Sequence, residues 1–192
     1  LYIHIPFCVR KCAYCDFYSV PDRLDLIDSY LDALLLEAKA YSGMTFETLY
    51  VGGGTPSLLG ATGIEKLLHG LSRTFNLKSL DEATIEVNPE SATLELYLSA
   101  RKLGVNRISI GVQSLSDSEL KSVGRIHTAR QALSAVVKAK EAGFSEVSAD
   151  VIIGLPGQDW SSLKTTLQKV MATGISHLSL YCLSLELGTP LG

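Results

Sequence analysis

The sequence has little of what marks a nucleic-acid-binding or membrane-spanning protein. Charged residues make up 19% of the 192 residues, and 17 basic against 20 acidic side chains leave a formal net charge of -3. Without a basic excess, no strong field attracts the chain to phosphate backbones or anionic lipids. No apolar run approaches the roughly 20 residues that cross a bilayer, and no secretion signal opens the chain. We therefore expect a soluble, cytoplasmic protein that binds no nucleic acid and has no transmembrane segment.

The chain also lacks a Pro/Gly-rich linker and any low-complexity tract, and its length suits one domain. It lacks an initiator methionine, because it opens inside the apolar run LYIHI, and it stops at the turn GTPLG. We therefore expect residues 1–192 to be a single core domain taken from a longer protein, without that protein's C-terminal domain.

Cysteine is scarce, and its distribution disfavours disulfides. Three of the four cysteines lie within CVRKCAYC at positions 8, 12 and 15, whereas Cys182 is near the other end. That spacing fits reduced thiolates holding a metal better than a disulfide framework. Cys182 shares the apolar parity of Leu178 and Leu180, so we interpret it as a small core residue.

Apolar residues alternate between a period of two and a period of 3.6, which predicts repeated strand–helix units around a mostly parallel sheet. The predicted strands span residues 1–5, 47–51, 84–88, 106–112, 147–153 and 177–183. Capping boxes are predicted to start helices where Thr62 pairs with Glu65, Ser116 with Glu119 and Thr128 with Gln131. Glycines 104, 143 and 174 are predicted to end helices.

The predicted strands carry apolar side chains on one face and polar side chains on the other. Ile85 and Val87 oppose Glu86, and Val151 opposes Asp150. A closed barrel or a doubly wound sheet would bury apolar side chains on both faces. An unpartnered buried polar group costs roughly 1–3 kcal/mol, so a polar inner face needs water or a ligand. We predict an α/β fold, a partial (β/α)6 TIM-type barrel with mostly parallel strands and outer helices, which cups a polar ligand.

The three clustered cysteines directly follow the first predicted strand, at the end where parallel strand–helix folds place their chemistry. A structural zinc site takes four protein ligands, and the nearest candidate for a fourth, His4, points into the predicted barrel. An iron–sulfur cluster is normally held by four cysteines, so three would leave one iron free for a ligand. We favour the cluster, and a zinc-bound interaction module stays open as an alternative.

The motif CVRKCAYC, with spacing CxxxCxxC, resembles the cluster loop of the radical S-adenosylmethionine (radical SAM) superfamily. The longer segment YIHIPFCVRKCAYCDFYS resembles the oxygen-independent coproporphyrinogen III oxidase family, including its heme-chaperone branch. Six further segments also resemble this family and occur in the same order: GGGTPSLL, EVNPES, GVQS, GRIHT, DVIIGLPGQ and LYCLSLELGTPLG. The resemblance implies a 4Fe–4S cluster held by Cys8, Cys12 and Cys15. It also implies that the open iron is chelated by S-adenosylmethionine (SAM), which one-electron reduction cleaves to a 5′-deoxyadenosyl radical.

The resemblance further implies a set of cofactor-binding residues: Tyr2, Tyr14, Gly53, Gly54, Thr55, Glu86, Gln113, Arg125, Asp150 and Ser184. Their chemistry is suitable. The glycines of GGGTP allow close approach to the backbone and offer successive N–H donors. The carboxylates suit ribose hydroxyls, and the guanidinium suits a carboxylate. GGGTP lacks the lysine of a phosphate loop, which disfavours a nucleoside triphosphate. Each residue also has a plainer interpretation as a turn, ion-pair or packing residue.

One departure from the resembling family bears on function. The resemblance implies that the decarboxylating oxidases carry a cysteine two positions after the third cluster ligand, where this chain has Phe17 in YCDFYS. We therefore predict a heme chaperone of porphyrin and heme metabolism that binds heme and hands it to an acceptor protein. The alternative is a coproporphyrinogen oxidase that decarboxylates propionates of a porphyrinogen. An electron donor is a further expected partner, and the sequence identifies no residue as catalytic or as the heme ligand.

Overall fold

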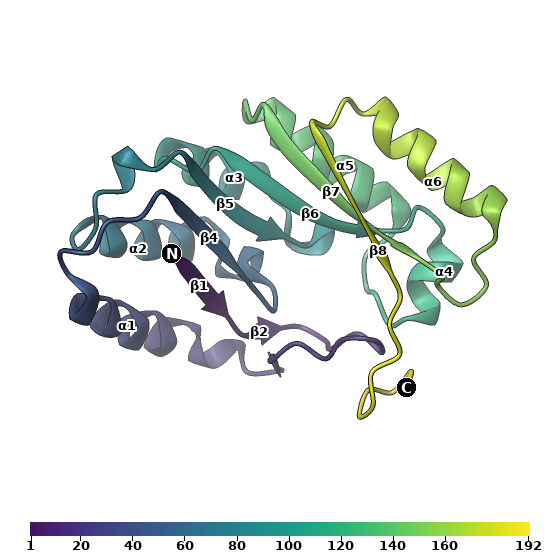
Figure 1. Ribbon diagram of the computed structural model, residues 1–192, viewed down its shortest axis with the longest axis horizontal. Coiled ribbons are helices and arrows are strands. Elements are labelled where there is room, and N and C mark those ends of the chain that lie inside the picture. The colour runs from purple at the N-terminus through teal and green to yellow at the C-terminus, as the bar shows by residue number, and fades with distance from the viewer.

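Six parallel strands form the frame of the molecule, which the computed structural model describes over residues 1–192 (Figure 1). They are β1 (Tyr2–Ile5), β4 (Thr48–Gly53), β5 (Glu82–Val87), β6 (Arg107–Gln113), β7 (Glu146–Ile153) and β8 (His177–Cys182). They pair in this order, each parallel to the next. A doubly wound sheet would reverse its strand order at a switch point. The sheet is therefore the predicted partial (β/α)6 barrel, with β1 and β8 at its edges, and each predicted strand is confirmed to within about two residues.

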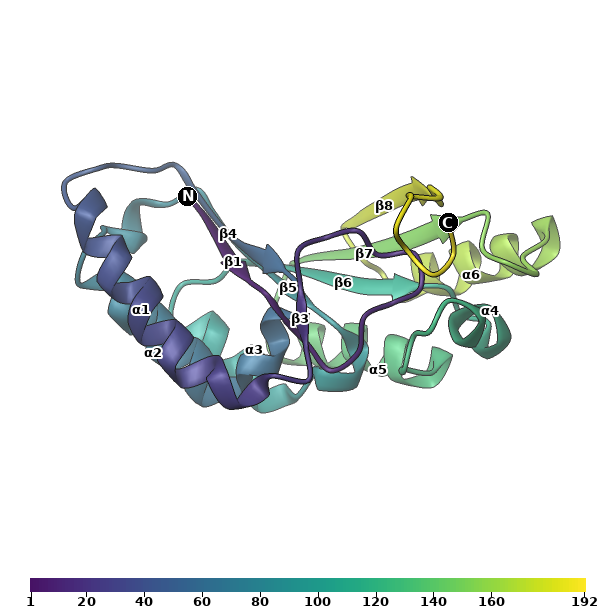
Figure 2. The ribbon, with the colours of Figure 1, turned by 90° about the horizontal axis from the view of Figure 1, so that it is seen from below.

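Helices connect successive strands. They are α1 (Ile27–Ala38), α2 (Gly60–Ser72), α3 (Leu94–Lys102), α4 (Asp117–Ser122), α5 (Ala129–Glu141) and α6 (Trp160–Ala172). Five short 3-10 helices supplement them: η1 (Leu24–Leu26), η2 (Lys39–Tyr41), η3 (Pro56–Leu59), η4 (Leu77–Ser79) and η5 (Pro89–Ser91). Helices α1, α2, α3 and α5 lie on one side of the sheet (Figure 2), as expected for outer helices. The helices are all too short or too polar to span a lipid bilayer.

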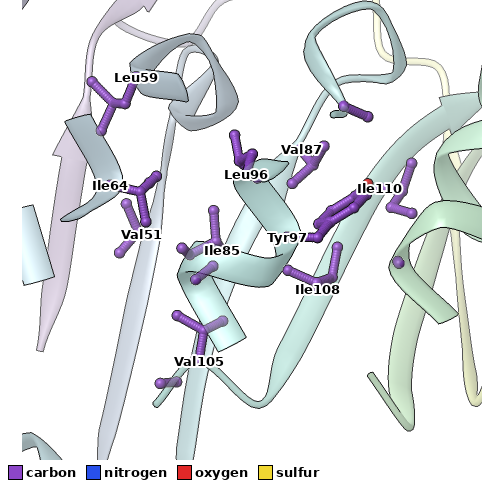
Figure 3. Close-up of a cluster of buried hydrophobic side chains, with 14 of the residues drawn as sticks. Val51, Leu59, Ile64, Ile85, Val87, Leu96, Tyr97, Val105, Ile108 and Ile110 are labelled. Atoms are coloured by element: carbon purple, nitrogen blue, oxygen red, sulfur yellow. The ribbon is translucent and has the colours of Figure 1, made fainter. Parts of the chain in front are cut away.

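The hydrophobic core lies between the sheet and these helices, where 33 buried residues form one cluster. Ile85 and Val87 of β5 and Ile108 of β6 point toward Leu96 and Tyr97 of α3 (Figure 3). Burying a side chain of this size contributes about 1.5–3 kcal/mol. The core thus fixes the apolar face of each strand and leaves the opposite face to the polar residues, as the strand parity predicts.

The helix termini agree only in part with the sequence patterns. Thr128 forms the predicted capping box with Gln131 at the start of α5. The predicted box at Thr62 is wrong, because α2 begins at Gly60 and places Thr62 inside the helix. The box at Ser116 is also wrong, since its hydroxyl makes no cap and lies 2.9 Å from the Ser118 hydroxyl.

Other helix ends follow backbone conformation. The glycines predicted to end helices all have positive φ: 98° at Gly104, 89° at Gly143 and 71° at Gly174. The sequence did not predict the capping box of Asp159 with Ser162 at the start of α6, because serine replaces the usual Glu or Gln of that motif.

Cys182 is not the predicted core residue, although it alternates along the strand with the same face as Leu178 and Leu180. It is exposed, and its neighbour Leu180 is 47% exposed. β8 is an edge strand, so its apolar parity face is less covered than that of a central strand.

Candidate functional site

The cysteine loop leaves the carboxyl end of β1 and is closed by two short strands. β2 (Phe7–Cys8) pairs in parallel with β3 (Val20–Pro21). The backbone N–H of Ala13 donates to the carbonyl of Val123 at 3.0 Å, and Leu191 N–H donates to Ala13 O at 2.9 Å. Figure 2 shows the loop reaching toward the segment after β8. The loop is therefore held against two segments that are distant in sequence.

A cavity of about 420 Å³ opens at the carboxyl ends of the strands. Among its lining residues are Cys8, Cys12, Tyr14, Cys15, Gly53, Gly54, Thr55, Glu86, Gln113, Arg125, Asp150 and Ser184. The structure thus brings together every predicted site residue except Tyr2. The Tyr2 side chain is 56% exposed, and its hydroxyl lies 2.9 Å from His4 Nδ1. Its ring stacks on Tyr50 with a centroid separation of 6.2 Å, so Tyr2 lies behind the cavity wall and contacts it only indirectly, through Tyr50 and His4.

All four cysteines are free thiols, and two of those in the loop receive hydrogen bonds at sulfur. Thr55 Oγ1 donates to Cys8 Sγ at 3.6 Å, and Arg125 Nη1 donates to Cys12 Sγ at 3.7 Å. Both donors are thus placed to stabilise the sulfurs once these bind a metal as thiolates. Burial raises the pKa of the Cys15 thiol, so ligation to a metal is what would hold it deprotonated.

A hydrogen-bonded chain joins the two cysteine contacts. Arg125 Nη2 donates to Asn88 Oδ1 at 2.9 Å and to the carbonyl of Gly111 at 3.1 Å. Asn88 Nδ2 in turn donates to Thr55 Oγ1 at 3.0 Å. Asn88 was not predicted as a site residue, although its place on the polar face just after β5 was a usable signal. These hydrogen bonds join Arg125, Asn88 and Thr55 into one polar wall behind the cysteines.

The glycine segment allows a close approach to the backbone but does not offer free donors. A Cβ on Gly53, where φ is 114°, would lie 2.7 Å from His4 Cε1, and a Cβ on Gly54 would lie 2.7 Å from Phe7 O. Only glycine fits there. Gly53 N–H already donates to Glu86 Oε2 at 3.1 Å, and Gly54 N–H donates to Ile5 O at 2.8 Å. The expectation of a cradle of free N–H groups is therefore wrong for these two residues.

Two carboxylates face the cavity from the polar side of the sheet. The Tyr50 hydroxyl donates to Glu86 Oε1 at 2.6 Å, and the Ser109 hydroxyl donates to Asp150 Oδ2 at 3.0 Å. Burial raises the pKa of Glu86 and of Asp150, although these hydrogen bonds counteract it. Each carboxylate oxygen can accept more than one hydrogen bond, so both acids can still receive hydroxyl donors from a ligand.

The donor set suits an iron–sulfur cluster better than a single zinc ion. No three or more His, Cys, Asp or Glu side chains converge on one point in the structure. A zinc ion needs its ligands around a single centre, whereas cysteines that hold a cluster bind different irons. Three free thiols around one cavity, with two hydrogen-bond donors at their sulfurs, match the second arrangement.

Comparison with known proteins agrees with this geometry. The chain is similar to the heme chaperone HemW of Lactococcus lactis, with 39% identity over 185 residues, or 96% of this chain and 49% of that protein. It is 38% identical over 198 residues to Escherichia coli HemW, covering 100% of this chain and 52% of that protein. The chain thus spans about half the length of the curated relatives it matches.

A solved structure is also similar over most of the chain. Coproporphyrinogen III oxidase (HemN) of Escherichia coli, described as a radical SAM enzyme, superposes with a TM-score of 0.86 at 32% identity. The match covers 95% of this chain and 43% of HemN. The model of the radical SAM superfamily matches residues 2–170. The chain therefore belongs to the radical SAM superfamily.

Proposed function

We propose that this chain is the radical SAM core domain of a heme chaperone, in which Cys8, Cys12 and Cys15 hold a 4Fe–4S cluster. The observation that carries the proposal is the similarity to heme chaperones along 96% of the chain. The family implies a 4Fe–4S cluster and SAM. When bound, these two groups supply one-electron chemistry that cleaves the SAM sulfonium.

Different cavity residues bind the methionine end and the nucleoside end of SAM. Gly53 and Gly54 line the cavity beside the cysteines and present their backbone to the methionine end. The segment of residues 4–7 packs so closely against them that neither position has room for a side chain. Arg125 carries a charge that suits the ligand's carboxylate. Burial acts to lower the pKa of Arg125, but the charge of Glu90 and the hydrogen bond to Cys12 raise it, so Arg125 stays a cation.

The remaining residues of the set face the nucleoside end. Glu86 and Asp150 accept ribose hydroxyls at oxygens that the protein leaves only partly occupied. Tyr14 covers the cluster, and burial raises the pKa of its hydroxyl, so the ring stays neutral. Ser184 lies across the cavity on the segment after β8. Tyr2 acts indirectly, by stacking on the Tyr50 ring whose hydroxyl holds Glu86.

A coproporphyrinogen oxidase is the second candidate, and the fold similarity to HemN favours it. Phe17 argues for the chaperone, because the resembling oxidases carry a cysteine at that position. Phe17 lines the cavity and is 66% exposed, so it presents an apolar ring where a thiol would otherwise face the ligand. A heme-acceptor protein and a one-electron donor complete the proposed set of partners.

The test uses the full-length protein, reconstituted anaerobically with iron and sulfide. We expect a 4Fe–4S spectrum that changes when SAM is added. Cys12→Ala should abolish this spectrum while the fold remains. The matched control is Cys182→Ala, which removes an exposed thiol outside the motif and should leave the cluster intact.

Parallel assays separate the candidate functions. Retention of added heme without conversion of coproporphyrinogen III supports the chaperone. Formation of a decarboxylated porphyrinogen supports the oxidase instead. A colourless protein that takes up zinc under the same conditions would contradict both and support the zinc-bound module.

A further inference from the structure

The chain makes an unusual turn at Gln113, where β6 ends. Ser114 N–H donates to the carbonyl of Val112 at 2.7 Å, and Gln113 between them has a φ of 62°. A hydrogen bond across one residue with positive φ defines the rarer, strained form of the γ-turn. Residues other than glycine, asparagine and aspartate seldom adopt a positive φ, and those that do are often found at functional sites.

The turn directs the Gln113 side chain back over the cavity wall. A Cβ built on Gly111 would lie 3.0 Å from Gln113 Nε2, 3.1 Å from Asn88 Oδ1 and 3.4 Å from Arg125 Nη2. The pairing of β6 with β7 also shifts register between Ile110 and Gln113. The amide of Gln113 therefore lies beside the guanidinium that contacts Cys12.

A buried histidine braces this turn from behind. His127 Nε2 lies 3.1 Å from the carbonyl of Val112, which can only accept, so Nε2 carries a proton. His127 Nδ1 lies 3.5 Å from Glu90 Oε2. Burial by itself would raise the pKa of Glu90, but His127 and the charge of Arg125 hold it below its usual value. Glu90 therefore flanks the imidazole ring at its Nδ1 edge, where neither Glu90 Oε2 nor His127 Nδ1 has a hydrogen-bond partner.

A second buried contact holds the other side of the turn. The Ser114 hydroxyl donates to Glu119 Oε2 at 2.6 Å, and both side chains are buried. Gln158 Nε2 donates to the same oxygen at 3.3 Å, which links the turn to the loop after β7. His127, Glu90 and Glu119 are absent from the cavity lining. His127 and Glu119 therefore act on a ligand through the turn, whereas Glu90 also interacts with the charge of Arg125.

We propose that His127 is a positioning residue that holds the strained turn at Gln113, so that the Gln113 amide donates to the carboxylate of an amino-acid ligand bound beside the cysteines. This inference rests on the proposed function, in which that ligand is SAM. Glu90 flanks the ring of His127, and Glu119 anchors Ser114.

The first experiment compares Gln113→Gly with Gln113→Ala in the full-length reconstituted protein. Both variants lack the amide, but only glycine relieves the positive φ. We expect Gln113→Gly to melt at a higher temperature than wild type and Gln113→Ala to melt below Gln113→Gly. Both should weaken SAM binding on the order of tenfold, read from the SAM-dependent change in the cluster's EPR spectrum. A residue with a purely structural role would not lose affinity while gaining stability.

The second experiment tests whether His127 acts through the turn. The double variant Glu90→Gln/His127→Leu removes the donor to Val112 without leaving a buried charge unpaired. It should weaken SAM binding on the order of tenfold when Gln113 is present and have no further effect combined with Gln113→Gly. The conservative variant His127→Gln keeps a donor of similar reach and should restore most of the affinity.

The outcomes are distinct. Equal loss of affinity in both backgrounds, or no loss in either, overturns the inference. If the double variant does not fold, the glycine and alanine variants decide, and equal melting temperatures for the two overturn it. A wild-type protein that carries the cluster but does not respond to SAM overturns the proposed function and this inference together. A responsive wild type with variants that match it overturns this inference alone.

Discussion

Replacing Arg125 by methionine should destabilise the protein before any cofactor binds. The side chain donates to Asn88 Oδ1, Gly111 O and Cys12 Sγ. Methionine has similar length but no donors, so the first two acceptors lose their partner. Each buried acceptor left unpaired costs about 1–3 kcal/mol. Asn88 is only half-buried and can regain water, so we expect a total loss of roughly 2–4 kcal/mol.

The assay is urea unfolding of the reduced, metal-free full-length protein, with Arg125→Lys as the matched variant. Lysine keeps the positive charge, but its single ammonium group cannot reproduce the planar fork that spans Asn88 and Gly111. We expect Arg125→Lys to lose less stability than Arg125→Met. After reconstitution, both should bind SAM more weakly than wild type, and Arg125→Met should bind it most weakly.

Two results would refute this reasoning. A metal-free Arg125→Met protein as stable as wild type would show that the hydrogen bonds to Asn88 and Gly111 contribute nothing. An Arg125→Lys protein with unchanged SAM affinity would show that charge alone is sufficient and that the fork geometry is irrelevant.

Three further substitutions test other parts of the structure. Because burial raises the pKa of Glu86, ionisation destabilises the fold, so Glu86→Gln should stabilise the metal-free protein at pH 7. Denaturation at several pH values should show this gain in stability disappearing below pH 4.5, the ordinary pKa of a glutamate. A gain that does not depend on pH would contradict the prediction. The Tyr97 hydroxyl is buried without a partner, so Tyr97→Phe should stabilise the protein by about 1 kcal/mol in thermal unfolding, whereas a loss would reveal a hidden partner. Asp159→Ala should cost about 1 kcal/mol by removing the α6 capping box, with exposed Ser161→Ala as the control that should be neutral.

Much of the fold was predictable because strand parity and helix-ending glycines are strong local signals. Residues 84–88 were predicted as a strand, and β5 spans Glu82–Val87. Local motifs failed where neighbouring segments decide the outcome. Thr62 has the spacing of a helix start, but the 3-10 turn of η3 leads directly into α2 and moves its start to Gly60. The exposure of Cys182 depends on β8 being an edge strand, which the strand itself does not encode.

The site was predictable where a short motif carries it and hidden where distant residues build it. The spacing of the three cysteines predicts a metal-binding loop, and the structure places all three around one cavity. Asn88 and Arg125 are 37 positions apart, so no local pattern shows their contact. His127 and Glu90 escaped notice for the same reason, because their roles exist only once β5 and β6 lie side by side.

The sequential strand order has a consequence for biosynthesis. Each strand joins the edge left by its predecessor, so a nascent chain can extend the sheet one strand at a time as it leaves the ribosome. Cys12 emerges 113 residues before Arg125, the cation that contacts its sulfur. The contact between Arg125 and Cys12 can therefore form only after β1, β4, β5 and β6 have been made.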